Sequence, residues 1–297
     1  MSLLDGPAAQ GYRAPMLHIP PPIPIAPSIA ELASRYGVWL CDIWGVLHNG
    51  VSPFPSAADA CRTFRAQGGK VALITNAPRP TEFVAAQLAA MGIDGVYDAI
   101  ATSGDVTMRL LRERAGQAVF HLGPERDKPI LEGLDLRRVG PDEADFILNS
   151  GPFHDETETP EDYRALFTAL AARTVPMVCA NPDHKVERGD TVIYCAGALA
   201  ALYEQMGGAV VYAGKPHAPI YELALHKLGV DAGASRILAI GDGVYTDILG
   251  AAIFGVDALF IASGVHMGRA GLDAESLAAL FDKTSFRPVA AQARLAW

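Results

Sequence analysis

Acidic side chains in this sequence follow short apolar runs that have the composition of buried strands. Asp42 follows VWLC (38–41), Asp242 follows RILAIG (236–241), and Asp247 comes five residues later. In open α/β sheets the carboxyl ends of parallel strands form the ligand-binding edge, so we expect these carboxylates to gather there. Clustered carboxylates repel one another unless a cation lies between them. Oxygen-only ligands of this kind suit Mg²⁺, usually bound together with a substrate phosphate.

Two further residues add hydrogen-bond donors and positive charge to the same edge. Thr75 ends the apolar run at 71–74, and Lys215 lies in the loop YAGKPHAP. Together with the acids they would form an oxygen cage for Mg²⁺ and a set of donors for a phosphoryl group. Taken singly, each residue has an ordinary interpretation, because an Asp after a strand is often a cap or turn residue and a loop lysine is usually solvated. Their joint arrangement is what indicates chemistry.

The elements that carry these residues alternate between strands and helices. Apolar runs predict strands at 38–41, 71–74, 236–240 and 258–264. Strands followed by helices form parallel βαβ units, whose crossovers place helices on both faces of the sheet. Ser56, followed three residues later by Asp59, predicts a capping box at the start of the first such helix. The expected fold class is therefore α/β, with a doubly wound, mainly parallel sheet.

The chain also divides into segments. The run HIPPPIPIAP favours an extended arm over residues 1–27, because proline removes backbone donors and fixes φ. Strand–helix alternation resumes within residues 109–208, which predicts a second α/β domain inserted into the first. We therefore expect a core formed by residues 28–108 and 209–297 and an inserted domain at 109–208.

Composition limits the classes of function. The 297 residues are 50% hydrophobic and carry a formal net charge of −9, which disfavours partners with anionic backbones or surfaces. We therefore expect neither a nucleic-acid nor a membrane partner. The four cysteines have apolar flanks and form no CxxC pair, which is typical of free thiols in a reducing compartment. No targeting segment is recognisable, so the expected location is cytoplasmic.

Four motifs together resemble the signatures of the haloacid dehalogenase superfamily of hydrolases. They are CDIWGV (41–46), LITNA (73–77), GKP (214–216) and GDGVYTD (241–247). The long gap between the second and third motifs is similar to that of the class II members, which carry an inserted cap domain. Two further stretches, at 98–107 and 180–204, resemble the class IIA subclass of nitrophenyl-phosphate and sugar phosphatases. The resemblance covers about residues 36–265.

The resemblance implies a Mg²⁺-dependent phosphatase that acts on a small phosphorylated metabolite such as a sugar phosphate. It makes Asp42 the nucleophile that forms an aspartyl-phosphate, with Lys215 paired to it and Thr75 bonded to a phosphoryl oxygen. The implied Mg²⁺ ligands are Asp42, the backbone carbonyl of Trp44, Asp242 and Asp247. The implied substrate-binding residues are Thr75, Asn76, Lys215, Asp183 and His184. Besides the small phosphorylated substrate, the partner that we consider is a second copy of the chain in a homodimer.

One residue departs from the family pattern. The phosphatases place a second Asp two residues after the nucleophile to protonate the leaving group, and here that position is Trp44. An indole cannot exchange a proton at neutral pH, and loss of a general acid costs about 10²–10⁴ in rate. Two alternatives therefore stay open: a dehalogenase-like attack on carbon, and a phospho-ligand-binding protein with little turnover. His48 could also supply the proton.

Overall fold

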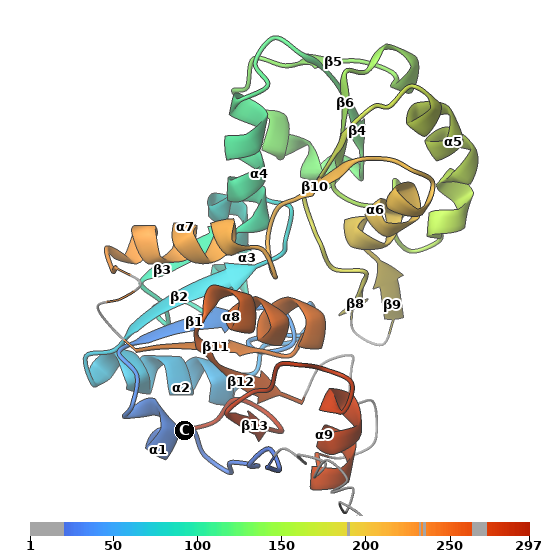
Figure 1. The fold of residues 1–297 in the computed structure, drawn as a ribbon. Coiled ribbons are helices and arrows are strands. Elements are labelled where there is room, and N and C mark those ends of the chain that lie inside the picture. The colour runs from blue at the N-terminus through green and yellow to red at the C-terminus, as the bar shows by residue number, and fades with distance from the viewer. Residues whose placement is uncertain (1–20, 189–190, 232, 234–235, 263–271) are drawn as a thin grey trace, which may run out of the picture.

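The computed structural model describes residues 21–188, 191–231, 233, 236–262 and 272–297, and forms two lobes that each contain a sheet (Figure 1). All neighbouring strands of the six-stranded first sheet pair in parallel. Their order is β13 (Ala290–Gln292), β12 (Asp257–Ile261), β11 (Ile237–Gly241), β1 (Val38–Asp42), β2 (Lys70–Thr75) and β3 (Ala99–Thr102). The predicted doubly wound, mainly parallel α/β fold is confirmed.

Helices cover both faces of this sheet because its strands are apolar on both sides. In β1, Trp39 packs with one helix layer, whereas Val38 and Leu40 pack with the other. The first layer contains α1 (Ala30–Ala33), α2 (Pro55–Ala66) and α3 (Thr81–Ala90). The opposite face carries α7 (Ala218–Leu228), α8 (Leu249–Phe254) and α9 (Ala274–Phe281). Strands buried on two faces are rigid, so residues at their ends have fixed positions.

The second sheet has five strands, all of them between β3 and β11 in the chain. Their order is β10 (Val210–Tyr212), β7 (Met177–Cys179), β6 (Phe146–Asn149), β4 (Ala118–Leu122) and β5 (Arg137–Arg138). One face packs against α5 (Arg164–Ala172) and α6 (Ala196–Gln205), and the other receives Leu111 of α4 (Ser103–Arg112). The inserted domain expected at 109–208 ends before β10, although this strand pairs with β7 of the second sheet.

Shorter elements complete both lobes. The second lobe adds the 3₁₀ turns at Glu125–Leu131, Pro141–Glu143 and Pro160–Tyr163, and the antiparallel hairpin of β8 (Lys185–Arg188) and β9 (Thr191–Tyr194). In the first lobe, a π-helical turn (Val244–Ile248) leads into α8. Figure 1 shows the hairpin beside the gap between the lobes. Among the described residues, no helix has the length and apolar character needed to cross a bilayer.

Local predictions for helix starts were partly wrong. Helix α2 begins at Pro55 without a side-chain cap, so the capping box expected at Ser56 does not form. Proline fits the first helical turn because its ring presets φ and it has no N–H to satisfy. The Asp59 carboxylate instead accepts a hydrogen bond of 2.9 Å from Arg62 on the helix surface.

The described part of the proline-rich arm lies along the edge of the first sheet. The N–H of Ala26 donates to the carbonyl of Ala291 (2.9 Å), and the N–H of Ala291 donates to the carbonyl of Pro24 (2.8 Å). Ile23 is buried beside them. Residues 1–20 of the predicted arm lie outside the described residues.

Carboxyl ends of strands from both sheets face the same space. One cavity is lined by residues that follow β1 and β2 of the first sheet, such as Trp44 and Ala77. Its other walls include Pro124, Ser150 and Asn181, which follow β4, β6 and β7 of the second sheet. Since ligands bind at the carboxyl ends of strands in open α/β sheets, the space between the lobes is the expected site.

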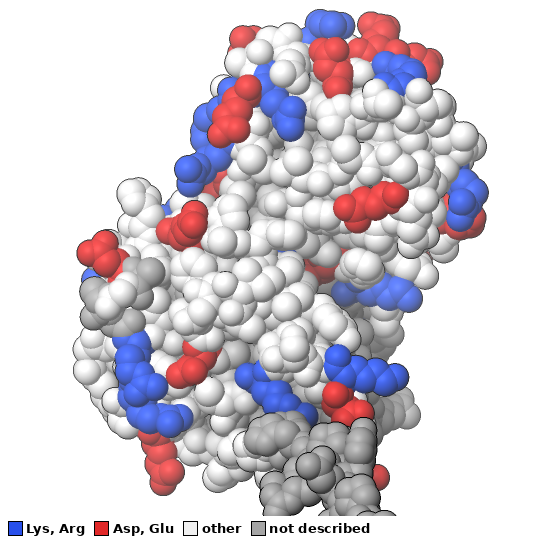
Figure 2. All heavy atoms as spheres, in the orientation of Figure 1, with Lys and Arg blue, Asp and Glu red and all other residues white. Residues whose placement is uncertain are grey.

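Charged side chains of both signs are scattered over the molecular face drawn in Figure 2. Neither blue nor red atoms form a continuous area there, and the middle of this face is mostly uncharged. Binding to a nucleic-acid backbone depends on an extended basic surface. This face of the protein offers none among its described residues.

Candidate active site

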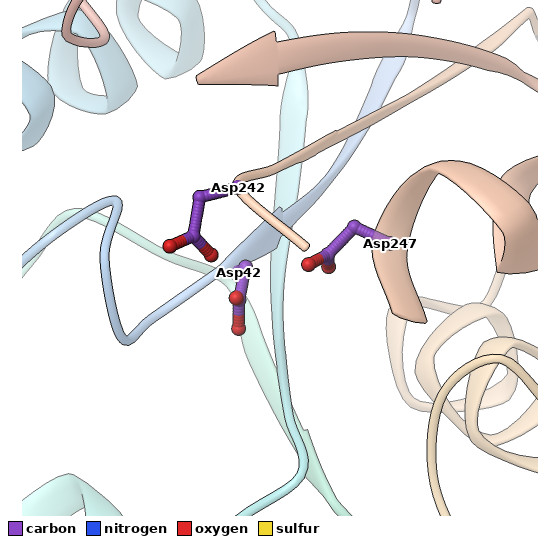
Figure 3. A group of neighbouring side chains, drawn as sticks. All are labelled: Asp42, Asp242 and Asp247. Atoms are coloured by element: carbon purple, nitrogen blue, oxygen red, sulfur yellow. The ribbon is translucent and has the colours of Figure 1, made fainter. Parts of the chain in front are cut away.

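Three carboxylates converge at the carboxyl edge of the first sheet (Figure 3). Asp42 ends β1, Asp242 directly follows β11, and Asp247 lies in the π-helical turn before α8. One ligand oxygen from each lies within 4.8 Å of the others. Asp42 and Asp247 are buried, and Asp242 is half-buried. A set of hard oxygen donors at this separation fits a divalent cation such as Mg²⁺ or Ca²⁺.

Lys215 lies against two of these acids. Its Nζ is 2.7 Å from Oδ1 of Asp42 and 2.8 Å from Oδ1 of Asp247, and the lysine is only 2% exposed. Burial raises the pKa of Asp42 to about 8, and the charge of Asp247 adds to this effect while Lys215 opposes it. Burial works to lower the pKa of Lys215, but the two carboxylates outweigh it and raise that pKa. A further cation would therefore be strongly favoured here.

The turn after β1 depends on a glycine. Gly45 has a φ of +83°, and a Cβ at this position would lie 2.2 Å from Oδ2 of Asp242. The N–H of Ile43 donates to Oδ1 of Asp42 (2.7 Å), which orients the carboxylate. The backbone thus passes so close to Asp242 that any side chain at position 45 would displace an acid of the cluster.

Asn76 connects the first sheet, the lysine loop and the second lobe. Its Oδ1 accepts a 2.7 Å hydrogen bond from the backbone N–H of Lys215. Its Nδ2 donates to Oδ1 of Asp183 (2.9 Å) and to the carbonyl of Lys215 (3.2 Å). Thr75, at the end of β2, accepts a 3.2 Å hydrogen bond from the N–H of Ala77 through its hydroxyl. The Thr75-Asn76 pair therefore holds residues from three separate segments at one edge.

A cavity of ≈ 610 Å³ adjoins the acids. Of the residues that the sequence singled out, it is lined by Asp42, Trp44, Thr75, Asn76, Asp183, His184, Asp242 and Asp247. Lys215 lies behind Asp42 and does not line it. Asp183 is half-buried, and His184 is exposed. The residues predicted from separate motifs are thus brought together, with His184 at the outer rim.

Trp44 is held by its own loop. Its ring centroid lies 5.2 Å from that of His48, and a Cβ on Gly50 would come within 2.4 Å of the indole. His48 is buried, and its Nδ1 accepts a 2.9 Å hydrogen bond from the N–H of Gly50. Burial lowers the pKa of His48 to about 4. The imidazole is therefore neutral at neutral pH and supports the turn that carries Trp44.

Sequence reasoning missed a second cavity of ≈ 290 Å³ that adjoins the first. Its charged lining includes Arg79, Arg126, Asp127, Asp155 and Arg188. Arg79 could have been found from its position four residues after Thr75, beyond the end of β2. The other four come from a 3₁₀ turn (Arg126, Asp127), a loop (Asp155) and the end of β8 (Arg188), and only the folding of the second lobe over the first sheet brings them to this place.

Comparisons with known proteins agree with this geometry. A family model described as haloacid dehalogenase-like hydrolase matches residues 39–137, and one described as HAD-hydrolase-like matches residues 212–282. A solved hydrolase of the haloacid dehalogenase-like family from Brucella suis 1330 is 44% identical to this chain. It covers 91% of this chain and 100% of its own, with a TM-score of 0.82. The chain belongs to this family.

Other proteins that are similar to this chain carry the names of phosphatases. Ribonucleotide monophosphatase NagD of Escherichia coli (strain K12) is 29% identical over 230 residues, which are 76% of this chain and 87% of that protein. Glycerol phosphate phosphatase Rv1692 of Mycobacterium tuberculosis, solved in complex with calcium, is 25% identical with a TM-score of 0.60. That match covers 79% of this chain and 68% of the other. The predicted family is confirmed, and these relatives support its phosphatase subclass.

Proposed function

We propose that the protein is a Mg²⁺-dependent phosphatase that hydrolyses a small phosphate monoester through an aspartyl-phosphate on Asp42. The observation that carries this proposal is the buried contact between Lys215 and Asp42 beside two further carboxylates. Attack by a carboxylate on an anionic phosphate requires that their mutual repulsion be cancelled. This cluster combines a nucleophile, Asp42, with the fixed positive charge of Lys215 and with oxygen ligands for a metal cation.

The reaction has two steps. In the first, one carboxylate oxygen of Asp42 attacks phosphorus, and the bond from phosphorus to the leaving oxygen breaks with its electron pair on that oxygen. In the second, water attacks phosphorus, inorganic phosphate departs, and the Asp42 carboxylate is regenerated. Mg²⁺ held by Asp42, Asp242, Asp247 and the carbonyl of Trp44 would supply positive charge to the phosphoryl oxygens. Lys215 orients Asp42 and offsets its charge.

The remaining site residues bind and enclose the substrate in this proposal. The hydroxyl of Thr75 lines the cavity and would donate to a phosphoryl oxygen. Asn76 fixes the loop of Lys215, and Asp183 and His184 bring the second lobe to the substrate. Enclosure between the lobes excludes bulk water, which strengthens every charge interaction within. This geometry suits small metabolites, and the phosphatase relatives are named for substrates of that kind.

Attack on phosphorus accounts for the acid cluster better than attack on carbon does. A dehalogenase-like reaction at Asp42 needs no metal, so three carboxylates within 4.8 Å would only add repulsion. Trp44 does not oppose phosphoryl transfer itself. It removes the usual proton donor, and therefore restricts the reaction to leaving groups that need little protonation or receive a proton from water.

Turnover of p-nitrophenyl phosphate, with and without Mg²⁺, tests this function. We expect release of nitrophenol by the wild type, loss in EDTA, and loss in Asp42→Asn. Asp94→Asn, which changes an exposed loop residue, is the matched control and should behave as the wild type. Retained turnover in Asp42→Asn would refute the proposal. Halide release from haloacids in EDTA would favour the attack on carbon.

A further inference from the structure

The cavity beyond Trp44 is lined by three arginines and three aspartates, and one of the arginines, Arg79, forms no ion pair among the described residues. We propose that the second cavity, lined by Arg79, Arg126 and Arg188, binds a second anionic group on the leaving part of the substrate. The preferred substrates are then phosphate monoesters that carry a carboxylate or another phosphate a few bonds from the ester oxygen. This inference rests on the proposed phosphatase function.

The two cavities meet at the reacting edge. Both are lined by Trp44, Thr75, Asp183 and Val186. A phosphoryl group beside Asp42 and Thr75 can therefore direct its ester oxygen past Trp44 into the second cavity. The ≈ 290 Å³ volume is at the small end of ligand pockets, which is suitable for a leaving group of a few carbon atoms.

Two of the three arginines meet at one carboxylate. Nη2 of Arg188 lies 3.0 Å from Oδ2 of Asp155, and Arg126 donates to the same oxygen. Each has a looser second acid, Glu156 at 3.7 Å from Arg188 and Asp127 at 4.0 Å from Arg126. Each guanidinium carries five N–H donors, so these contacts leave donor capacity, although not surplus charge, on the wall of the second lobe.

Arg79 forms no ion pair with a carboxylate within the described part of the chain, although its charge acts to lower the pKa of Asp127. Its Nε is buried without a hydrogen-bond acceptor, and its guanidinium lies 5.3 Å from the ring centroid of Phe83. The first turn of α4 fixes its backbone, because a Cβ on Gly104 would lie 2.4 Å from the carbonyl carbon of Arg79. A buried guanidinium N–H without an acceptor is costly, and a bound anion would remove that cost. The rigid fork of donors suits carboxylate or phosphate oxygens.

The acids of this cavity have other partners. Asp127 is hydrogen-bonded to Ser150 and lies 4.0 Å from Nε of Arg126, and Asp155 is occupied by Arg126 and Arg188. Asp183 accepts from Asn76 at the boundary of the two cavities. None of these described carboxylates forms an ion pair with Arg79. An ester with a neutral end would leave Arg79 unpaired in this cavity, so the site would discriminate against it.

Three esters that differ only at one end test the inference. They are glycerol 3-phosphate, with a neutral end, 3-phosphoglycerate, with a carboxylate, and glycerol 1,3-bisphosphate, with a second phosphate. Calorimetric titration of Asp42→Asn protein with Mg²⁺ measures binding without turnover. We expect at least one of the two ligands with an anionic end to bind about tenfold or more tightly than glycerol 3-phosphate. The tighter of the two identifies the anion.

Variants at position 79 test whether Arg79 causes the preference for an anionic end. Arg79→Gln in the Asp42→Asn background should make the Kd values of the three esters equal. Arg79→Lys keeps the charge but loses the planar set of donors, so it should retain part of the difference in Kd. Arg112→Gln, an exposed arginine of α4, is the matched control and should keep the full ratio. Equal Kd values for all three esters, or a ratio that survives Arg79→Gln, would overturn the inference.

Failure of the function and failure of the inference are distinguishable. A wild type that hydrolyses none of these esters and no p-nitrophenyl phosphate would refute the phosphatase, while an Arg79-dependent binding preference would still support the anion site. A wild type that hydrolyses all three esters with the same kcat/KM would refute the anion site and leave the phosphatase intact.

Discussion

Nζ of Lys215 lies 2.7 Å from Oδ1 of Asp42, and the side chains are only 2% and 9% exposed. The ammonium group thus offsets the charge of the proposed nucleophile in a region from which water is largely excluded. Lys215→Met should lower kcat by about 10²–10³-fold, the usual effect of losing one charged stabilising group. It should also lower Tm, because buried carboxylates lose their partner. Lys283→Met, at an exposed position, is the control; equal kcat in both variants would contradict this role.

The acid cluster predicts stabilisation by a divalent cation. Mg²⁺ should raise the Tm of the wild type, because it relieves the repulsion among Asp42, Asp242 and Asp247. Asp242→Asn should reduce that rise sharply, whereas Asp94→Asn should preserve it. Differential scanning fluorimetry across a Mg²⁺ series measures both. An undiminished Mg²⁺ response in Asp242→Asn would place the cation elsewhere.

Alanine variants of Gly45 and Gly92 distinguish the effect of backbone strain from the effect of displacing Asp242. Gly45 and Gly92 both have positive φ, at +83° and +71°, so alanine at either costs roughly 1–2 kcal/mol of strain. Only at Gly45 would the new Cβ meet Asp242, whereas nothing lies within 4 Å at Gly92. Gly45→Ala should therefore lose the Mg²⁺-induced rise in Tm, and Gly92→Ala should keep it. Loss in both variants would show that strain alone is responsible.

Trp44 predicts a steep dependence of rate on the leaving group. Without a general acid, p-nitrophenyl and acetyl phosphate should turn over much faster than alkyl esters, whose leaving oxygens are strong bases. Trp44→Asp should selectively accelerate the alkyl esters by up to about 10²-fold. Values of kcat/KM across esters of graded leaving-group pKa provide the measurement. A flat dependence in the wild type that becomes steep in His48→Ala would identify His48 as the donor instead.

Asp127 predicts a pH-dependent contribution to stability. Burial raises its pKa to about 6 from 3.8, although Arg126 and Arg79 oppose the shift. Because the native state holds this proton more tightly than the unfolded chain, the free energy of unfolding should fall as pH rises from about 4 to 6. Asp127→Asn should thus be more stable than the wild type at pH 7, by on the order of 2 kcal/mol, and not at pH 3.5. Urea denaturation at both pH values tests this; equal effects at both would contradict it.

The sequence was informative where local pattern determines position. The runs that end at Asp42, Thr75 and Gly241 are buried strands, and parallel strands place their carboxyl ends at one edge, so the acid cluster could be predicted. The start of α2 was not predicted correctly, because Pro55 presets the first turn and makes the capping box of Ser56 unnecessary.

Features that depend on packing between the lobes could not be predicted from local pattern. The hydrogen bond from Asn76 to Asp183 joins residues 107 positions apart, and Arg126 and Arg188 meet at Asp155 from separate segments of the second lobe. None of these segments shows a periodicity or spacing that indicates its partner. Their positions follow from how the second sheet packs over the first.

The most direct test of the central claim is the chemical state of Asp42 during turnover. Wild-type protein mixed with p-nitrophenyl phosphate and Mg²⁺, quenched in acid within one turnover, should carry one phosphoryl group, and peptide mass spectrometry should locate it at Asp42. The group should be absent in Asp42→Asn. Nitrophenol release without phosphorylated Asp42, or with the group on another residue, would contradict the proposed mechanism.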